Sequence, residues 1–311
     1  MSDSSAPVGV LVMAHGTPES PAEIAPFYTR IRRGRPPSPE LLSELERRYA
    51  AIGGTSPLND VTAAQVAGLT AALTQRAGYR FAVAFGAKHT APFIEDAALS
   101  LRAGRRDVIG LVLTPHGSTM GSQEYFERAE TALGPQCRFH AVPPWYAEPG
   151  FVAVMATRVN QALAALGPPS KRARYPVVFT AHSLPERVRS MGDTYPEQLE
   201  TSARLVAQVA GLSRWLVAFQ SAGRTPEPWL GPDVRQVVGQ LGRRGHTDGV
   251  VVCPIGFVAD HLEILYDIDI ELAAVARHAG LRFARTASLN DDTAFMGVLA
   301  DVVCAAAARC D

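Results

Sequence analysis

Short apolar runs recur along the chain, and longer amphipathic stretches separate them. Seven of these runs have the length and the β-branched content of strands. They are VGVLVMA (8–14), RFAVAFG (80–86), DVIGLVLTP (107–115), YPVVFTA (175–181), RWLVAFQ (214–220), DGVVVCP (248–254) and LRFARTA (281–287). Because most of the runs are continuously apolar and do not alternate with polar residues, they predict parallel strands that helices cover on both faces.

The stretches between the strands carry the apolar spacing of amphipathic helices. The clearest patterns lie at 62–77, 197–211 and 234–245, and an apolar helix is expected within 292–310. This alternation of strand and helix is typical of a doubly wound α/β fold.

The chain also resembles itself. VLVMAHGTPE at 10–19 and VVFTAHSLPE at 177–186 share an Ala-His pair, a Pro three residues after the His, and the following Glu. VLTPHGS at 112–118 and VVCPIGF at 251–257 match at their Pro and Gly. We therefore expect two Rossmann-like doubly wound domains that arose by duplication.

The expected boundaries are 1–145 for an N-terminal domain and 146–288 for a C-terminal domain. A last helix at 289–311 is expected to pack back on the first domain. The first domain carries an insertion at about 20–60 that has no counterpart in the second. Irregular insertions on regular scaffolds are common places for substrate contacts.

Composition excludes several classes of function. The 311 residues hold 30 Lys+Arg and 30 Asp+Glu, so the net charge of zero indicates neither nucleic acid nor an anionic membrane as partner. No apolar stretch approaches the ~20 residues of a membrane span, and the start of the chain lacks a signal-peptide pattern. We expect a cytoplasmic protein whose four scattered cysteines form no disulfides.

Three histidines, His15, His116 and His182, directly follow or end apolar runs. Ligands of open parallel sheets bind at the carboxyl ends of the strands, so these side chains are candidates for a site. A single histidine at such a place more often only bonds its own surroundings, and this alternative stays open for each. The duplicated Ala-His motif favours His15 and His182, which would face each other if the two domains do.

Three carboxylates, Glu263, Asp267 and Glu271, follow a fourth strand at four-residue steps, and Asp260 extends the row. On a helix they share one face, where each like-charged step costs about 0.2–0.5 kcal/mol. Either a cation occupies the row or it is a solvated face. Imidazole with carboxylates suits a borderline divalent ion such as Fe²⁺, and the lack of a thiolate set indicates a labile site.

The insertion is rich in arginine. Guanidinium groups can bind carboxylates of a ligand in bidentate fashion, although a solvated basic helix face is the alternative. The arginines concerned are Arg30, Arg32, Arg33, Arg35, Arg47 and Arg48.

Five motifs resemble the ferrochelatase family, and most of all its soluble coproporphyrin-using members from Gram-positive bacteria. They are YTRIRRGRP (28–36), IGGTSPLN (52–59), VVFTAHSLPE (177–186), TPEPWLGPDV (225–234) and GFVADHLEILYD (256–267), in the family's order. The resemblance runs from about residue 9 to residue 305. It implies the chelatase fold, with two Rossmann-like domains and an active-site cleft between them, and an enzyme that inserts Fe²⁺ into a porphyrin.

The resemblance also implies roles for individual residues. His182 and Glu263 would be the catalytic pair, which binds the incoming metal and handles the pyrrole protons. Asp267 and Glu271 are similar to the family's acidic path for metal or protons. The family's porphyrin-contacting positions match Ile31, Arg32, Arg48, Ser56, Gln65, His89, Tyr125 and Trp229. Arg33 is added to them because it belongs to the same YTRIRRGRP motif as Arg32.

Two departures from the family pattern matter. Gram-positive members usually have Tyr, the axial ligand of the product iron, where this chain has His15. We expect His15 to contact the porphyrin opposite His182 and to ligate iron, with a bond to its own backbone segment as the alternative. Some members hold a [2Fe–2S] cluster on four cysteines. Because all four cysteines of this chain would have to converge to supply one, we expect no required cofactor and Fe²⁺ as a substrate only.

The expected reaction is therefore the insertion of ferrous iron into coproporphyrin III to give coproheme, in haem biosynthesis. The expected enzyme is a monomeric lyase that hands its product transiently to a downstream enzyme of the pathway. The arginine-rich insertion and the lack of a membrane anchor favour this water-soluble, four-propionate substrate. The alternatives are a protoporphyrin IX ferrochelatase, a sirohydrochlorin-type chelatase, and a non-catalytic porphyrin- or metal-binding protein.

Overall fold

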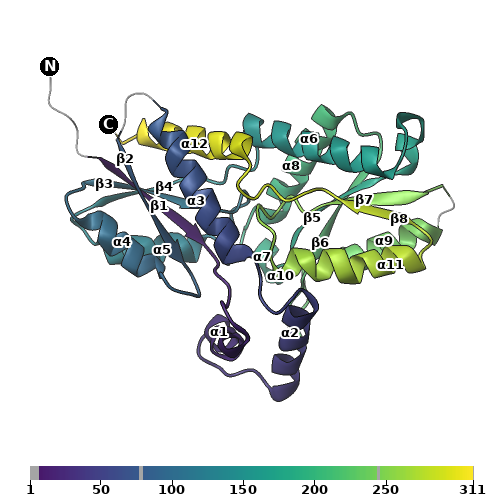
Figure 1. Ribbon diagram of the computed structural model, residues 1–311, viewed down its shortest axis with the longest axis horizontal. Helices are drawn as coiled ribbons and strands as arrows, with labels where there is room; N and C mark the ends of the chain where they lie inside the picture. Colours follow the sequence, from purple (N-terminus) through teal and green to yellow (C-terminus); the bar gives the residue numbers. More distant parts are fainter. Residues whose placement is uncertain (1–6, 77–79, 244–245, 311) are drawn as a thin grey trace. The chain divides into compact units, whose positions relative to one another are not determined.

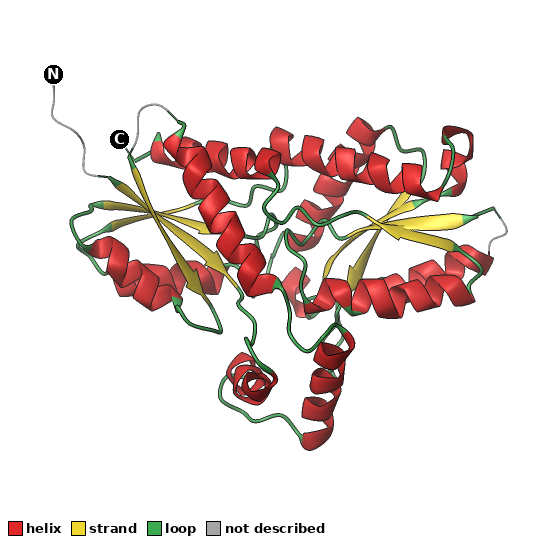
Figure 2. Ribbon diagram, viewed as in Figure 1, coloured by secondary structure: helices red, strands yellow, loops and turns green. Residues whose placement is uncertain are grey.

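The computed structural model describes residues 7–76, 80–243 and 246–310, and these form two compact α/β units. Unit 1 comprises Met1–Thr114, Gly121–Trp145 and Asn290–Asp311, and unit 2 comprises Pro115–Met120 and Tyr146–Leu289. Each unit has a four-stranded parallel sheet with helices on both faces (Figures 1 and 2). The continuous apolar character of the strands predicted this arrangement, because both faces of each strand need cover.

The sheet of unit 1 has the strand order β2-β1-β3-β4. Its strands are β1 (Val8–Ala14), β2 (Phe81–Ala87), β3 (Asp107–Val112) and β4 (Arg138–Ala141). The central strand β1 is almost wholly buried, with Met13 paired to Gly86 of β2 and to Val112 of β3. The carboxyl end of β1 therefore lies in the middle of the sheet, where it delivers His15.

Helices of unit 1 cover both faces of this sheet (Figure 1). On one face, α4 (Ile94–Arg102) and α5 (Gln123–Leu133) pack on Leu11 and Met13 of β1. On the other face lie α3 (Leu58–Thr74) and α12 (Thr293–Ala307), which pack against each other. The segment between β1 and α3 holds a 3₁₀ turn (Pro21–Glu23), α1 (Ile24–Ile31) and α2 (Pro39–Ala51).

The sheet of unit 2 repeats the same order, β6-β5-β7-β8. Its strands are β5 (Val177–His182), β6 (Trp215–Gln220), β7 (Gly249–Cys253) and β8 (Arg282–Arg285). The repeated Ala-His motifs therefore end the equivalent central strands β1 and β5 of the two sheets. This equivalence is the structural counterpart of the internal repeat in the sequence.

Two layers of helices also cover the sheet of unit 2. On one face lie α6 (Pro149–Leu166) and α8 (Tyr195–Ala210). A 3₁₀ turn (Pro169–Arg174) follows α6, and the short α7 (Arg187–Ser190) precedes α8. On the other lie α9 (Val234–Arg243), α10 (Leu262–Leu265), a π-helix (Asp267–Leu272) and α11 (Ala273–His278). A core of Val178, Ala218, Val252, Ile264 and Ile268 joins this second layer to the strands.

All seven predicted strands are present, but an eighth was missed. The edge strand β4 has only four residues, RFHA, of which the first and last are exposed. Such a short and half-polar run gives no strand signal. The predicted helices are present too; residues 77, 244 and 245, at the ends of two of them, lie outside the described residues.

The helix expected around the carboxylate row differs from the prediction. It begins only at Leu262, so Asp260 lies before it in the loop, where it accepts hydrogen bonds from Arg285 and Ser288. From Asp267 it widens to a π-helix, in which Glu271 N–H donates to the carbonyl of Tyr266, five residues back. The inclusion of Asp260 in the row was therefore wrong. The three remaining carboxylates span a change of helical pitch, a feature often found at functional sites.

Among the described residues, none of the helices has both the length and the apolar character that a bilayer crossing requires.

Candidate active site

His182 is the last residue of β5, and the chain turns away from the sheet directly after it. In register it pairs with Gln220 of β6, so its side chain points to the face that α9, α10 and the π-helix cover. Glu263 reaches the same place from α10, which follows β7. The Nε2 atom of His182 lies 3.3 Å from Oε1 of Glu263, and the two side chains are 35% and 31% exposed. The two predicted catalytic residues of unit 2 therefore form a solvent-accessible ion pair.

Backbone and side-chain hydrogen bonds hold the His182 ring in place. Its Nδ1–H donates to the carbonyl of Ser183, which leaves Nε2 as the nitrogen that gains or loses a proton beside Glu263. The hydroxyl of Tyr195 donates to the carbonyl of His182 over 2.9 Å. Tyr195 is buried, so this bond fixes the end of β5 against helix α8.

Glu263 has two further neighbours. Nε2 of His261 lies 3.6 Å from its Oε2, and Nε2 of Gln220 donates to its backbone carbonyl over 3.0 Å. Gln220 in turn accepts a hydrogen bond from the hydroxyl of Thr180. Sequence reasoning missed His261, Gln220 and Tyr195. The doublet of His261 and Glu263 in ADHLE was the one available signal, because imidazole and carboxylate two residues apart can meet at a helix start.

The electrostatics of the pair follow from this geometry. Burial alone would lower the pKa of His182, but the Glu263 carboxylate and its hydrogen bond outweigh this and raise the pKa of His182 to about 9. Burial would raise the pKa of Glu263, whereas His182 and then His261 hold it well below its usual value. The pair is therefore an imidazolium and a carboxylate near neutral pH, and it shares one exchangeable proton.

Asp267 and Glu271 continue from Glu263 along the π-helix. Asp267 accepts a hydrogen bond from the hydroxyl of Ser221, whose φ of 58° is in the left-handed region. The guanidinium of Arg235, on α9, has a raised pKa because of its hydrogen bonds to Asp233 and, to a smaller extent, because of the charges of Glu271 and Asp267. Part of the repulsion within the acidic row is thus offset by a protein cation.

In unit 1, His15 follows β1 and its exposed ring lies near two other rings. The centroids of His15 and His89 are 4.6 Å apart, and Phe27 of α1 stands edge-on to both. Nδ1–H of His15 donates to the carbonyl of Gly16. Gly16 has a φ of +81°, and a Cβ there would overlap the side chain of Thr90, so this turn requires glycine.

His89 is held in its neutral form. Burial, followed by the charges of His15, Lys88 and Arg128, lowers the pKa of His89 to about 3. Its Nδ1 is buried and has no hydrogen-bond partner within the described part of the chain. An uncharged imidazole with an open acceptor nitrogen suits contact with a flat, largely apolar ligand that carries polar groups.

The other residues matched to porphyrin-contacting positions are also in unit 1, except Trp229. Ile31 ends α1 with 37% exposure. The Arg32 guanidinium lies over the Tyr28 ring at 5.7 Å, and Arg33 has a φ of 56°. Arg48 is in the last turn of α2. The insertion thus presents basic and apolar side chains together.

Three of these residues are largely buried. The hydroxyl of Ser56 accepts from the N–H of Leu58, and Nε2 of Gln65 donates to the carbonyl of Asn290. Tyr125 belongs to the core of α4 and α5, with the Lys88 ammonium 5.0 Å from its ring centre. Burial raises the pKa of the Tyr125 phenol, which is therefore a neutral donor.

Trp229 is in unit 2, in the loop after β6. Its ring lies so close to Gly223 that a Cβ on Gly223 would overlap it, and its Nε1–H donates to the hydroxyl of Thr225. The structure thus places His182, Glu263, Asp267, Glu271 and Trp229 in unit 2, and His15 and the other predicted porphyrin-contacting residues in unit 1.

His116, the third candidate histidine, is enclosed. It is 2% exposed, and its Nε2 shares a hydrogen bond with the hydroxyl of Ser202. Burial lowers the pKa of His116 to about 3, so it is neutral. These contacts favour the local hydrogen-bonding alternative for this residue.

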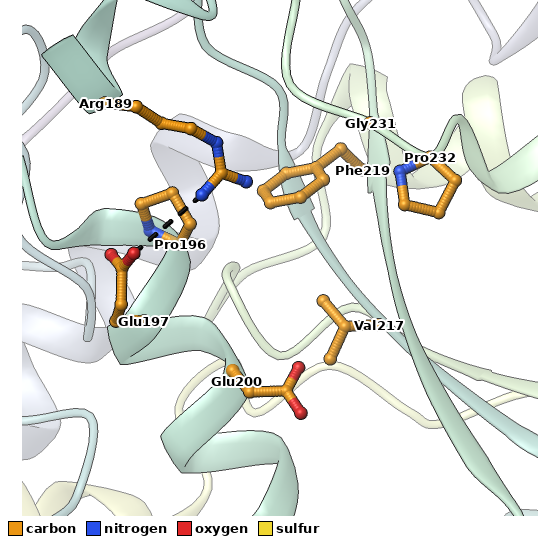
Figure 3. A pocket seen from close by; sticks show the side chains of 8 residues that line it. All are labelled: Arg189, Pro196, Glu197, Glu200, Val217, Phe219, Gly231 and Pro232. Atoms are coloured by element: carbon orange, nitrogen blue, oxygen red, sulfur yellow. Dashed lines mark ion pairs between the residues drawn. The ribbon is translucent and has the colours of Figure 1, made fainter.

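A hollow of about 320 Å³ in unit 2 is separate from these groups (Figure 3). Val217 and Phe219 of β6 line it together with residues of α8, among them Glu197, which pairs with Arg189. Successive residues of a strand point to opposite faces, so these two side chains face away from the side of Gln220 and His182. The hollow contains none of the predicted site residues.

The four cysteines are dispersed. Cys137 and Cys253 are buried in the cores of unit 1 and unit 2, whereas Cys304 and Cys310 are at the end of the chain, in unit 1.

Comparison with known proteins gives the family. A family model described as Ferrochelatase matches residues 7–307. The chain belongs to the ferrochelatase family. Curated ferrochelatases similar to it include the coproporphyrin III ferrochelatase of Geobacillus kaustophilus, 43% identical over 302 residues, which cover 95% of this chain and 94% of that protein. The coproporphyrin III ferrochelatase of Bacillus subtilis is 42% identical over 301 residues, with 95% and 96% covered.

Solved structures support the fold. The siroheme-biosynthesis enzyme CbiX of denitrifying bacteria aligns with a TM-score of 0.54 at 16% identity and covers 96% of this chain and 98% of its own. The sirohydrochlorin chelatase SirB from Bacillus subtilis subspecies spizizenii, in complex with cobalt, gives 0.57 at 12% identity, with 97% and 96% covered. The expectations of a ferrochelatase and of a two-domain chelatase fold with parallel sheets are confirmed.

Proposed function

We propose that this protein inserts Fe²⁺ into coproporphyrin III and releases coproheme. The observation that carries the proposal is the overall match to coproporphyrin III ferrochelatases at 42–43% identity over 95% of the chain. The exposed pair of His182 and Glu263 supports it, because metallation needs proton acceptors that can also meet a borderline metal ion.

The pair can perform the proton chemistry in the following way. Metallation removes two pyrrole N–H protons from the macrocycle and strips water from Fe²⁺. The positive charge of arriving Fe²⁺ disfavours the imidazolium of His182, so its shared proton passes to solvent. Neutral imidazole and carboxylate first replace water on the iron. When the iron passes into the macrocycle, the same two groups become free to accept the two pyrrole protons.

Asp267 and Glu271 are proposed to conduct Fe²⁺ or protons to this pair. They follow Glu263 in the chain and lie on the π-helix, and the charge of Arg235 offsets part of their own. A divalent cation beside them would relieve the remaining repulsion. Ser221, which donates to Asp267, would keep that carboxylate in position.

The insertion is proposed to hold the porphyrin. Arg32, Arg33 and Arg48 supply guanidinium groups for the propionates, and Ile31, His89 and Trp229 supply apolar and aromatic contacts for the ring. Ser56, Gln65 and Tyr125 would add neutral hydrogen-bonding groups. Fixing the propionates fixes the orientation of the macrocycle for metallation, which is how positioning contributes to rate.

His15 is proposed to ligate the iron of the product. Its Nδ1 donates to the carbonyl of Gly16, so Nε2 would be the nitrogen that binds the iron. Neutral imidazole binds both ferrous and ferric iron.

The remaining parts of the proposal concern the state of the protein in the cell. We propose a cytoplasmic monomer that requires no [2Fe–2S] cluster or other cofactor and that passes coproheme transiently to the next enzyme of haem biosynthesis. Iron is in this view a substrate and not a resident metal. The 1–145 and 146–288 domains, with a terminal helix at 289–311, would be its functional halves.

Anaerobic incubation with Fe²⁺ and either coproporphyrin III or protoporphyrin IX tests the proposal. We expect the metalloporphyrin spectrum to form with both and faster with coproporphyrin III, because four propionates engage more of the arginines than two. Faster turnover of protoporphyrin IX would contradict the substrate. Porphyrin binding without metallation would contradict the enzyme and indicate a carrier.

A further inference from the structure

Three potential metal ligands meet on unit 1, at the end of the sheet where the strands begin. Asp107 is the first residue of β3, His140 is the third residue of β4, and Cys310 follows the end of α12. Their ligand atoms, a carboxylate oxygen, a ring nitrogen and Sγ, all lie within 4.8 Å of one another. Within the described ranges, this is the one group of three or more such side chains.

Nothing in the sequence brings these residues together. They are separated by 33 and 170 positions, and α12 returns to the sheet of unit 1 only at the end of the chain (Figure 1). Pairing of β3 with β4 places Asp107 opposite Arg138 and Ile109 opposite His140. The convergence is thus a product of the fold, and the ferrochelatase reaction proposed above uses none of the three residues.

Two of the three side chains are partly exposed, and the third, that of Cys310, is buried. Asp107 is 16% and His140 25% exposed at the side chain, and Cys310 is 9% exposed overall. Nε2 of His140 lies 2.7 Å from Oδ1 of Asp107, while Oδ2 accepts from the Arg138 guanidinium over 2.7 Å. These contacts with Arg138 and His140 keep the pKa of Asp107 lowered, although burial would raise it. The carboxylate is therefore ionised and oriented with one oxygen toward His140.

We infer that Asp107, His140 and Cys310 bind a divalent transition-metal ion of the zinc class. Imidazole, thiolate and carboxylate are the donors that Zn²⁺, Co²⁺ and Fe²⁺ accept, whereas Mg²⁺ and Ca²⁺ select oxygen. Three protein ligands leave one position of a tetrahedron for water.

The geometric adjustment is small. Ligand atoms around one tetrahedral Zn²⁺ lie about 3.2–3.8 Å apart, given bond lengths of about 2.0–2.3 Å. The His140–Asp107 contact must open by less than about 1 Å, and Sγ of Cys310, at most 4.8 Å from the other two ligand atoms, must approach them by no more than about 1.5 Å. Cys310 lies three residues beyond the end of α12, so its approach does not require the helix to move.

Binding of the metal ion releases a proton from the protein. The thiol of Cys310 loses its proton to solvent, and His140 presents the lone pair of Nε2 with its proton on Nδ1. The ion replaces the hydrogen between His140 and Asp107, and Oδ2 of Asp107 keeps its bond to Arg138. The affinity should therefore rise with pH.

A bound ion would cross-link the segment after α12 to strands β3 and β4. β4 is an edge strand of four residues and has a neighbour on one side only. An ion held by β3, β4 and Cys310 would favour the folded state, because the unfolded chain does not bring the three ligands together.

Cobalt titration of the metal-free full-length protein tests this inference. Co²⁺ bound to a thiolate gives a charge-transfer band in the near-ultraviolet, which the imidazole–carboxylate pair of His182 and Glu263 cannot give. We expect the band in the wild type and in Cys304→Ser, a matched control six residues upstream, and no band in Cys310→Ser. Asp107→Asn and His140→Gln should each lower the Co²⁺ affinity at least ~10-fold.

A second measurement protects the test against misfolding. Zn²⁺ should raise the Tm of the wild type and of Cys304→Ser by a few degrees and leave that of Cys310→Ser unchanged. Iron insertion by Cys310→Ser should stay near the wild-type rate, which separates this site from the proposed function. A thiolate band that persists in Cys310→Ser, the lack of any band in the wild type, or an iron–sulfur chromophore on these cysteines would overturn the inference.

Discussion

Nε2 of His182 lies 3.3 Å from Oε1 of Glu263, and the bond from Nδ1 to the carbonyl of Ser183 holds the ring in this orientation. The distance and the paired shifts in pKa make the two side chains one proton-sharing unit.

Removal of either member should therefore stop most of the turnover. We expect His182→Ala and Glu263→Gln each to lower kcat by about 10²–10⁴-fold, the usual contribution of a general acid–base group. Porphyrin binding, followed by fluorescence quenching, should persist. Because the pair acts as a unit, the double variant should be little slower than either single one. Near-native turnover of one single variant would exclude that residue from the chemistry.

The pKa of His182 should depend on Glu263. In the wild type it is raised to about 9, and NMR of the ring resonances should show this midpoint. In Glu263→Gln it should fall, because the carboxylate that outweighs burial is lost and only the hydrogen bond to Ser183 and the charge of Asp267 still raise it. Glu271→Gln serves as the control and should stay near 9.

The same shift has a consequence for stability. A histidine with a raised pKa in the folded state contributes stability fully below 6.5, and this contribution disappears as the pH rises through about 9. Wild type should therefore lose more stability than Glu263→Gln between these pH values, as measured by urea unfolding. Parallel profiles of the two proteins would mean that the charges of the pair do not interact.

The acidic row should affect iron more than porphyrin. Asp267→Asn and Glu271→Gln should raise the KM for Fe²⁺ several-fold with a smaller change in kcat, because each removes a charge that attracts the cation. Asp269→Asn is the matched control: Asp269 is on the same π-helix but pairs with Arg285. Equal effects of all three substitutions would indicate a general loss of helix stability.

The arginines of the insertion should affect porphyrin more than iron. Arg32→Ala and Arg48→Ala should each weaken coproporphyrin binding by about 1.5–3 kcal/mol, or roughly 10–150-fold, if the lost contact is a charge-assisted hydrogen bond. Arg102→Ala, at the exposed end of α4, should have no effect. Unchanged porphyrin affinity in both insertion variants would leave the solvated basic face as the explanation.

Substitution of His15 should change the vibrational spectrum of the coproheme complex. Resonance Raman spectra of the coproheme complex should change between wild type and His15→Ala, because the axial imidazole is lost, and should stay the same in the control His278→Ala. The wild type should also retain its product after reduction, since imidazole binds ferrous iron. Identical axial signatures in wild type and His15→Ala would show that His15 only bonds Gly16.

The sequence predicted the structure best where every residue of a segment has to meet the same requirement, such as burial on both faces of a strand. Strands β1 and β5 must be apolar on both faces, so their approximate limits, and the histidines at their carboxyl ends, could be predicted from the apolar runs. Strand β4 could not, because an edge strand with exposed ends has no such demand. Helical spacing likewise predicted that Glu263, Asp267 and Glu271 belong together, but not the π-helix, which depends on backbone bonds that no residue pattern specifies.

Contacts between residues that are far apart in the chain could not be predicted from the sequence. Tyr195, Gln220 and His261 bond the catalytic candidates from three separate segments, and the convergence of Asp107 with Cys310 needs the return of α12. Each of these residues also has an ordinary role in its own element. Tyr195, for example, begins a helix, which gives no reason to connect it with His182.

The assignment of Pro115–Met120 to unit 2 has a consequence for the history of the chain. Asp193 of unit 2 accepts hydrogen bonds from Ser118 and Thr119, and Gln198 accepts one from Gly117, although these three residues come from the loop after β3 of the other repeat. A gene fragment for residues 146–289 alone would lack these donors and leave a buried carboxylate short of partners. The two repeats have thus become interleaved, and recombination can no longer exchange either of them as a single contiguous cassette.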